Sequence, residues 1–378
     1  MADKSLGLYI HIPFCLQKCL YCDFCSYPAV AEEMRSAYVA ALCREIREAA
    51  PILTDYLVDT MFFGGGTPSL LSAEEYLHIS KAVFENYRVV PSLEFTSEAN
   101  PATLDDEKLT AMREAGINRL SIGMQSANAG ELSALGRVHR NEDVFTSVEM
   151  ARRAGFDNIN LDLMFGIPEQ TKETFATSLE AALSMSPEHL SVYSLQIEEG
   201  TPFYERRTFL SLPSEEEESE MAELLYRTAE RSGYRRYEIS NFARDGMECR
   251  HNLRYWRMQD YRGFGVSAHS LIGDHRFFNG GGLSTYIHDP LGIAEEEELL
   301  SPAMREYEAL MLALRTADGV EDAAFTAEFG HGFAEKYGKR IAPFLSRGLM
   351  VLQNGRYALT KAGMSVSNGI LREILDEM

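Results

Sequence analysis

The chain has 378 residues, of which 45% are hydrophobic and 25% charged, a composition typical of globular proteins that excludes intrinsic disorder. Its formal net charge of -21 produces a field that repels phosphate backbones, so we expect no nucleic-acid partner. The chain has no run of about 20 apolar residues, so we expect no integral membrane segment. Its N-terminal sequence also lacks the pattern of a secretory leader. We therefore expect a cytoplasmic protein.

Short β-branched or aromatic runs alternate with segments of helical spacing along the first half of the chain. The predicted strands are 8–13, 60–63, 93–97, 119–124, 158–164 and 189–195. The predicted helices are 31–48, 73–86, 105–115, 141–154 and 172–185. This alternation predicts an α/β fold with right-handed crossovers and a parallel sheet, and we favour a curved partial (β/α)6 barrel over an open sheet or a full barrel.

The second half of the chain is organised differently. An acidic helix is predicted over 214–232, with a solvated first turn, and a seventh strand over 237–242. After residue 301, the expected elements are helices at 304–314 and 323–337, a third helix near Ile341, and two apolar runs at 349–353 and 357–360. Asn354-Gly355 between those runs favours a hairpin turn. We expect a small winged-helix-like α+β domain that packs against the barrel or docks a partner.

Cysteines provide the first functional indication. Four of the six lie close together, at Cys15, Cys19, Cys22 and Cys25, which indicates metal or redox chemistry rather than a secreted disulfide scaffold. The first three form Cys-x3-Cys-x2-Cys directly after the first predicted strand, where such folds place active sites. Three thiolates on one loop favour an iron–sulfur cluster, and zinc is the alternative. Cys25 is not expected to be a ligand.

This motif, with aromatic Tyr21 before its third cysteine, resembles that of the radical S-adenosylmethionine (SAM) enzymes. The resemblance implies that Cys15, Cys19 and Cys22 hold a 4Fe-4S cluster whose open iron is chelated by SAM. In that family, an electron from the cluster cleaves SAM to methionine and a 5'-deoxyadenosyl radical, while the protein orients SAM and excludes water. An electron donor is implied as a partner, and no catalytic residue is assigned.

Glycine and polar residues follow several predicted strands at positions that resemble the family's SAM-binding motifs. The segment 64–68 reads Gly-Gly-Gly-Thr-Pro, which is similar to the family's glycine motif. Taken singly, a polar residue here could be a helix cap or a satisfied core group, but strand ends of a parallel sheet converge. By resemblance, SAM would be bound by Gly65, Gly66, Thr67, Glu98, Gln125, Arg137 and Asp162, with Tyr9 and Tyr21 as weaker candidates.

Longer segments narrow the resemblance to one branch of the family. YIHIPFC, EFTSEANP, GINRLSIGMQS, LGRVHR and DLMFGIPEQT resemble the group that contains oxygen-independent coproporphyrinogen III oxidase and the heme chaperones of the HemW family. The oxidase motif ends in Cys-x-Cys, whereas Phe24 stands at that position here. The oxidase also has an N-terminal extension, whereas 14 residues precede Cys15. Both departures favour the chaperones.

The sequence HNLRYW at 251–256 resembles the HNxxYW heme-binding motif of those chaperones. The resemblance implies heme binding by His251, Asn252, Tyr255 and Trp256. A neutral imidazole is a common axial ligand of heme iron, although a histidine beside Tyr and Trp is also typical of a packed core. Cys249 is disfavoured as a second heme contact. We assign no chemistry to His11, His139 or His269.

We therefore expect a heme chaperone that binds a 4Fe-4S cluster, SAM and heme and passes heme to an acceptor protein. One alternative is the oxidase, in which the radical abstracts hydrogen from propionate side chains and carbon dioxide leaves. The other is a zinc-stabilised interaction module. The expected domains are 1–240 for the barrel with its cofactor site, 241–300 for the heme-motif segment and connection, and 301–378 for the winged-helix-like domain.

Overall fold

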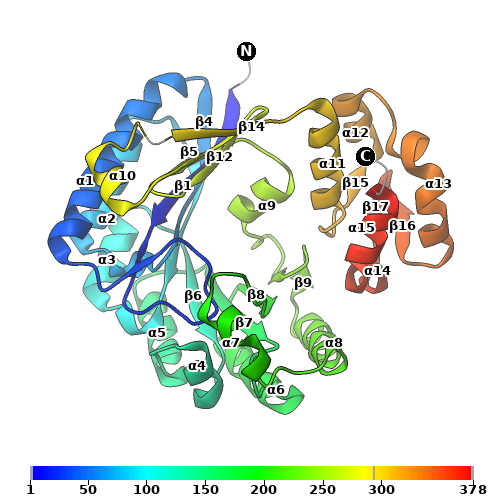
Figure 1. Cartoon of the computed structure of the whole chain (residues 1–378), viewed down its shortest axis with the longest axis horizontal. Helices are drawn as coiled ribbons and strands as arrows, with labels where there is room; N and C mark the ends of the chain where they lie inside the picture. Colours follow the sequence, from blue (N-terminus) through cyan, green and yellow to red (C-terminus); the bar gives the residue numbers. More distant parts are fainter. Residues whose placement is uncertain (1–2, 293, 376–378) are drawn as a thin grey trace.

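The computed structural model describes residues 3–292 and 294–375, and a single large sheet organises most of them (Figure 1). The strand order is β14-β13-β12-β11-β1-β4-β5-β6-β7-β8-β10-β9. The central six strands are parallel: β1 (Lys4–Ile12), β4 (Tyr56–Gly65), β5 (Val89–Ala99), β6 (Arg119–Gln125), β7 (Ile159–Phe165) and β8 (His189–Ser194). These are the six predicted strands, and the α/β partial-barrel prediction is confirmed.

Helices cover the outer side of the curved sheet, connecting these strands and, with α8, following the last of them (Figure 1). They are α1 (Glu32–Ala49), α2 (Ala73–Phe84), α3 (Asp106–Glu114), α4 (Ala129–Leu135), α5 (Asn141–Arg153), α6 (Lys172–Ser184) and α8 (Glu215–Arg231). Each long helix buries one apolar stripe, as α1 does with Tyr38, Leu42 and Ile46 at four-residue spacing. The predicted crossover helices are confirmed to within two residues at their ends.

Four strands absent from the sequence prediction extend the sheet beyond β1. β11 (Tyr261–Phe264) pairs in parallel with β1, and β12 (His269–Ile272), β13 (His275–Asn279) and β14 (Ala294–Leu299) follow as antiparallel neighbours. Part of the 241–300 segment, expected only as a motif and connection, is therefore integral to the sheet. β14 is the outermost strand at this edge, and its sequence is AEEEEL.

At the opposite edge of the sheet, the structure differs from the seventh predicted strand, 237–242. Only Asn241–Ala243 (β10) pairs with β8, and it does so antiparallel, next to the two-residue β9 (Arg235–Arg236). The intervening residues form a turn, because the Glu238 carboxylate accepts the Ser240 N–H at 3.1 Å. A continuous strand over 237–242 is therefore wrong.

Shorter elements shape the loops around the sheet. They are β2 (Phe14–Cys15), β3 (Tyr27–Pro28), α7 (Pro202–Arg206), α9 (Arg250–Trp256), α10 (Leu283–His288), and the 3-10 turns η1 (Ala50–Ile52), η2 (Pro68–Leu70), η3 (Pro101–Thr103) and η4 (Arg207–Phe209). β2 pairs in parallel with β3 and so closes the loop that carries the clustered cysteines. Among the described residues, no helix is long and apolar enough to span a membrane.

The C-terminal elements build a second, smaller core. They are α11 (Pro302–Ala313), β15 (Val320–Glu321), α12 (Asp322–Phe329), α13 (Phe333–Ser346), β16 (Met350–Gln353), β17 (Arg356–Leu359), α14 (Lys361–Ser365) and α15 (Ser367–Leu375). The predicted hairpin is confirmed, with Asn354 and Gly355 at φ of 50° and 75°. The predicted helix 323–337 is wrong, because Gly330 adopts φ of 80° and ends α12, and α13 then runs through Ile341. The three domain boundaries stay predictions.

Candidate functional site

A cavity of about 390 Å³ lies at the carboxyl ends of the central parallel strands. The cysteine loop after β1 forms one wall, and the ends of β4, β5, β6 and β7 form the others. Residues far apart in sequence gather here because parallel strands end at one edge of the sheet. The predicted residues that line it are Cys15, Cys19, Tyr21, Cys22, Gly65, Gly66, Thr67, Glu98, Gln125, Arg137 and Asp162.

Tyr9 is the predicted SAM-site residue that does not line this cavity. Its hydroxyl lies 3.0 Å from His11 Nδ1, and its ring stacks on Phe62 with ring centroids 6.3 Å apart. Tyr9 therefore packs beside His11 and Phe62, outside the set of residues that line the cavity.

The thiols of Cys15, Cys19 and Cys22 are free and partly exposed at the cavity. Thr67 Oγ1 lies 3.7 Å from Cys15 Sγ, and Arg137 Nη1 lies 3.5 Å from Cys19 Sγ. Such donors to sulfur tune iron–sulfur clusters. In the described parts of the chain, no three His, Cys, Asp or Glu side chains lie close enough to hold a single metal ion. This donor set of three thiols around one cavity fits a multi-iron cluster.

The glycine motif after β4 lies against the cysteine loop. Gly66 donates its N–H to the Ile12 carbonyl at 2.9 Å, and a Cβ on Gly66 would lie 2.6 Å from the Phe14 carbonyl oxygen. At Gly65, φ is 107° and a Cβ would lie 2.3 Å from the His11 ring. Both positions require glycine so that the two cavity walls can approach each other.

Two carboxyl groups face the cavity from β5 and β7, the strands on either side of β6. Glu98 accepts the Gly65 N–H at 3.2 Å, and burial together with repulsion from Asp162 raises the pKa of Glu98 to about 8. Burial also raises the pKa of Asp162, whose oxygens accept hydrogen bonds from Asn160 Nδ2 at 2.8 Å and Ser121 Oγ at 3.1 Å. A cationic ligand would relieve the repulsion between these two groups.

Two buried polar atoms at the cavity lack a hydrogen-bond partner. They are Gln125 Oε1 and Arg137 Nε, although Arg137 also donates from Nη2 to the Gly123 carbonyl at 3.1 Å. Gln125 has φ of 57°, a conformation that few non-glycine residues adopt. Buried polar atoms are usually satisfied, so these atoms indicate a place for a polar ligand. The cavity therefore fits SAM, which offers amino, carboxylate and hydroxyl groups.

The sequence prediction missed several residues of this cavity. They include Lys18, Phe24, Val138, Met164 and Tyr193. Tyr193 is near the end of β8, so the strand-end rule that found Glu98 and Asp162 could also have found it. Burial of its hydroxyl raises the pKa of Tyr193, although 41% of the residue's surface is exposed.

Cys25 and two histidines hold the cysteine loop and the strands in place. Cys25 Sγ lies 3.9 Å from the Tyr27 hydroxyl and is not among the residues lining the cavity. His11 Nε2 lies 2.9 Å from the Cys25 carbonyl, and His139 Nε2 lies 3.1 Å from the Met124 carbonyl. Burial lowers the pKa of each histidine to about 4, which keeps both neutral.

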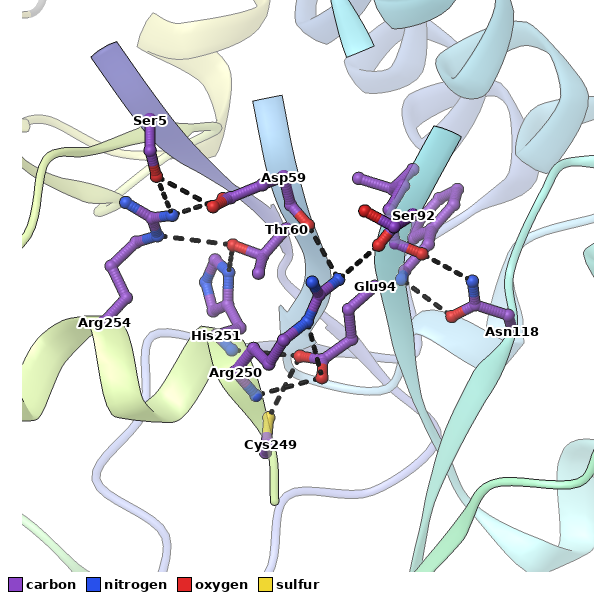
Figure 2. A network of polar contacts seen from close by, with 12 residues as sticks. Ser5, Asp59, Thr60, Ser92, Glu94, Asn118, Cys249, Arg250, His251 and Arg254 are labelled. Carbon is purple, nitrogen blue, oxygen red and sulfur yellow. Dashed lines mark hydrogen bonds and ion pairs between the residues drawn. The ribbon is translucent and has the colours of Figure 1, made fainter. Parts of the chain in front are cut away.

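His251 lies away from the cavity, on α9, and is fully buried against the sheet (Figure 2). Its Nδ1 lies 2.9 Å from Thr60 Oγ1, and its Nε2 lies 2.8 Å from the Tyr255 hydroxyl. Its ring stacks on Phe62 at a centroid distance of 5.3 Å. Burial lowers the pKa of His251 to about 3, so the imidazole is neutral. Asn252 and Trp256 are half-buried.

A buried chain of hydrogen bonds connects α9 with the cavity. The Cys249 N–H donates to the Tyr237 hydroxyl at 3.3 Å, which lies 2.8 Å from His189 Nε2. His189 Nδ1 lies 2.6 Å from Asn160 Oδ1, and Asn160 Nδ2 donates to Asp162 at 2.8 Å. The SAM-site candidates and the heme motif thus occupy separate places in one polar interior.

Comparison with known proteins gives the family. Residues 9–182 match the radical SAM superfamily, and residues 300–366 match the HemN C-terminal domain. A heme chaperone HemW from Bacillus subtilis is 38% identical over 98% of this chain and 99% of its own length. A heme chaperone HemW from Lactococcus lactis is 33% identical over 99% of this chain and 98% of its own length. The chain belongs to the HemW family.

A solved structure extends this comparison to the whole fold. Coproporphyrinogen III oxidase (HemN) from Escherichia coli, described as a radical SAM enzyme, matches this HemW-family chain with a TM-score of 0.86. The two are 26% identical, and the match covers 100% of this chain and 92% of that one. Membership of the radical SAM superfamily assigns a 4Fe-4S cluster and SAM as cofactors. The zinc-stabilised module is therefore discarded.

Proposed function

We propose that this HemW-family chain is a heme chaperone, which binds heme and transfers it to an acceptor protein. The observation that carries the proposal is similarity along the whole chain, 38% identity over 98% of its residues, to a protein named as a heme chaperone. The HNLRYW segment on α9 supports it, because it supplies a neutral imidazole next to aromatic rings.

The cofactor residues are part of the proposal. Cys15, Cys19 and Cys22 would ligate the cluster, which supplies one electron to SAM when both are bound. Arg137 and Thr67 would donate hydrogen bonds to the ligating sulfurs of Cys19 and Cys15, as they do to the free thiols. SAM would be held by Tyr21, Gly65, Gly66, Thr67, Glu98, Gln125, Arg137 and Asp162, with Tyr9 as a weaker candidate. The chain's residues orient SAM and exclude water.

Two further points belong to the proposal. Reduction of the cluster needs a one-electron donor as a partner. Four partly exposed free thiols on one loop suit a reducing compartment, so we place the protein in the cytoplasm.

The heme ligands proposed are His251, Asn252, Tyr255 and Trp256. The test is a heme titration of anaerobically cluster-reconstituted protein, followed at the Soret band, for the native chain and for His251→Ala. We expect saturable binding in the native chain and its loss in the variant. Apomyoglobin then serves as a generic acceptor. The native chain should transfer heme to it faster than the chain releases heme into buffer.

Oxidative decarboxylation is the alternative that the same preparation tests. The whole-chain likeness to HemN keeps it in view, although Phe24 stands where the oxidase motif has cysteine. Carbon dioxide release from coproporphyrinogen III by protein that shows no saturable heme binding would overturn the chaperone proposal in favour of the oxidase.

A further inference from the structure

The α9 helix is docked inside the barrel by a carboxylate from a distant strand (Figure 2). Cys249, the residue at its N-cap, provides no side-chain hydrogen bond to the first turn. Instead, Glu94 on β5 accepts the N–H groups of Arg250 and His251, both at 2.9 Å, and lies 3.6 Å from the Cys249 thiol. Glu94 is 8% exposed, so this contact is shielded from water. The start of α9 is therefore fixed by the sheet rather than by its own sequence.

A second set of contacts holds the inner face of α9. Thr60 on β4 is 1% exposed, and its hydroxyl contacts both His251 Nδ1 and Arg254 Nε, at 2.9 and 3.4 Å. Arg254 donates to Ser5 Oγ at 2.8 Å and pairs with Asp59 (Figure 2). β1 and β4 thereby grip the same helical face that carries His251.

This docked arrangement cannot be the one in which His251 ligates heme iron. Ligation requires one ring nitrogen, and both are hydrogen-bonded, to Thr60 and to Tyr255. A macrocycle also has to reach the ring, which is fully buried and stacked on Phe62. At least one hydrogen bond must break and the side chain must leave the barrel before iron can bind.

The segment is built so that it can move as a unit. α9 has only seven residues, too few to be stable without its docking contacts. Gly246 before it and Met258 after it adopt left-handed backbone conformations, with φ of 76° and 48°. For Met258 this conformation is uncommon and is held by the surrounding structure. These two positions are the places where the chain direction would change.

We propose that α9 is a latch, in which Glu94 and Thr60 are positioning residues that hold the HNLRYW segment closed, and that heme is captured by a minor open state in which His251 has left Thr60. The inference rests on the proposed function and adds how access of heme to His251 is controlled. Heme that binds only the open state shifts the population toward it, and the apparent affinity is reduced by the fraction that is open.

Thr60→Val tests the latch and should leave the cofactor cavity intact. Removing the hydroxyl deprives His251 and Arg254 of a partner, so the open fraction and the heme association rate should rise about fivefold, equivalent to about 1 kcal/mol. Thr60→Ser retains the hydroxyl and should restore the native rate. Thr96→Val is the matched control, because Thr96 is equally buried on β5 but its hydroxyl has no partner in the structure.

Three readouts separate the outcomes. Stopped-flow Soret absorbance gives the rate of heme capture, hydrogen exchange of residues 249–257 gives opening, and emission from Trp256, the only tryptophan in the chain, reports on α9 without heme. Faster capture with faster exchange in Thr60→Val, and neither in Thr96→Val, supports the latch. A merely destabilised barrel would accelerate exchange throughout the sheet and lower cluster content.

Failure of the latch and failure of the chaperone function give different results. If the native chain binds heme but Thr60→Val captures it at the native rate, the latch is overturned and the function stands. If no variant binds heme saturably, the proposed function fails and takes the latch with it. If Thr60→Val does not fold, Glu94→Gln replaces it, because this change weakens the capping of α9 and keeps the size of the side chain. Glu94→Gln must then show the same acceleration of heme capture, or the proposal is rejected.

Discussion

The cofactor cavity and the α9 helix lie in the same barrel but satisfy their polar atoms in opposite ways. At the cavity, Gln125 Oε1 and Arg137 Nε are buried without partners. On α9, both ring nitrogens of His251 are hydrogen-bonded, and Arg254 is paired. A ligand therefore completes the cavity, whereas it must first disrupt the docking of α9. The cofactor site is therefore formed in advance, whereas the heme motif has to open.

The largest effect expected at the preformed site comes from its thiols. Replacing Cys15, Cys19 or Cys22 singly by Ala should lower the iron content of anaerobically reconstituted protein from about four per chain to near background, because three thiolates are the minimum set. Iron analysis and visible absorbance measure this. Cys25→Ala is the matched control and should keep its iron, and a loss as complete as in the other variants would make Cys25 a ligand.

The glycine motif provides the next largest effect. Gly66→Ala would place a methyl group 2.6 Å from the Phe14 carbonyl oxygen and 2.9 Å from the Ile12 carbonyl oxygen. Both oxygens are backbone atoms, so the cysteine loop must move. We expect a loss of about 1–3 kcal/mol in unfolding free energy and reduced cluster loading. Urea denaturation and iron analysis check both. Native stability and full loading would show that the cavity walls are more pliable than this contact implies.

The carboxyl pair gives a pH effect. Because the pKa of Glu98 is raised to about 8, the ligand-free protein holds Glu98 mainly protonated below that pH. Its raised pKa stabilises the fold below pH 4.5, and this contribution is lost as pH rises through about 8. Binding of cationic SAM needs Glu98 in its ionised form. The affinity for SAM should therefore increase by up to about tenfold per pH unit as the pH approaches 8. Calorimetry of native protein and Glu98→Gln measures this, and equal pH dependence in both would remove Glu98 from the site.

The smallest predicted effect lies outside both regions and provides a reference for Gly66→Ala. Gly338 is within α13, where a Cβ would meet nothing within 4 Å. Gly338→Ala should raise the unfolding free energy by about 0.5–1 kcal/mol through helix propensity alone. We expect urea denaturation to show this higher unfolding free energy, with unchanged cluster content. A decrease in stability would mean that added methyl groups destabilise this chain even where space is available.

Local patterns predicted the barrel and most of its cavity. The six parallel strands each have a short β-branched or aromatic run, and the strand-end rule then placed Glu98 and Asp162 together without any knowledge of their distance. Tyr9 rests on motif resemblance alone: its hydroxyl contacts His11, and it is not among the residues that line the cavity, so its part in SAM binding stays a prediction.

The parts that could not be predicted depend on contacts between distant segments. β11 joins the sheet beside β1 although about 250 residues separate them, and no local pattern encodes that pairing. Glu94 is an acidic residue within a strand, and only the folded chain shows that it caps α9. The break at Gly330 was missed because helical spacing continues on both sides of it.

The sheet's two edges bear on how the chain behaves in crowded solution. An open edge strand offers unpaired backbone groups to any other strand, which promotes aggregation. Here β14 ends one edge with glutamates such as Glu295 and Glu298, and β9 ends the other with only two residues. Two copies joining through β14 would bring carboxylates together, and β9 is too short to serve as a template. A twelve-stranded sheet can thus remain dispersed even while its cofactors are absent.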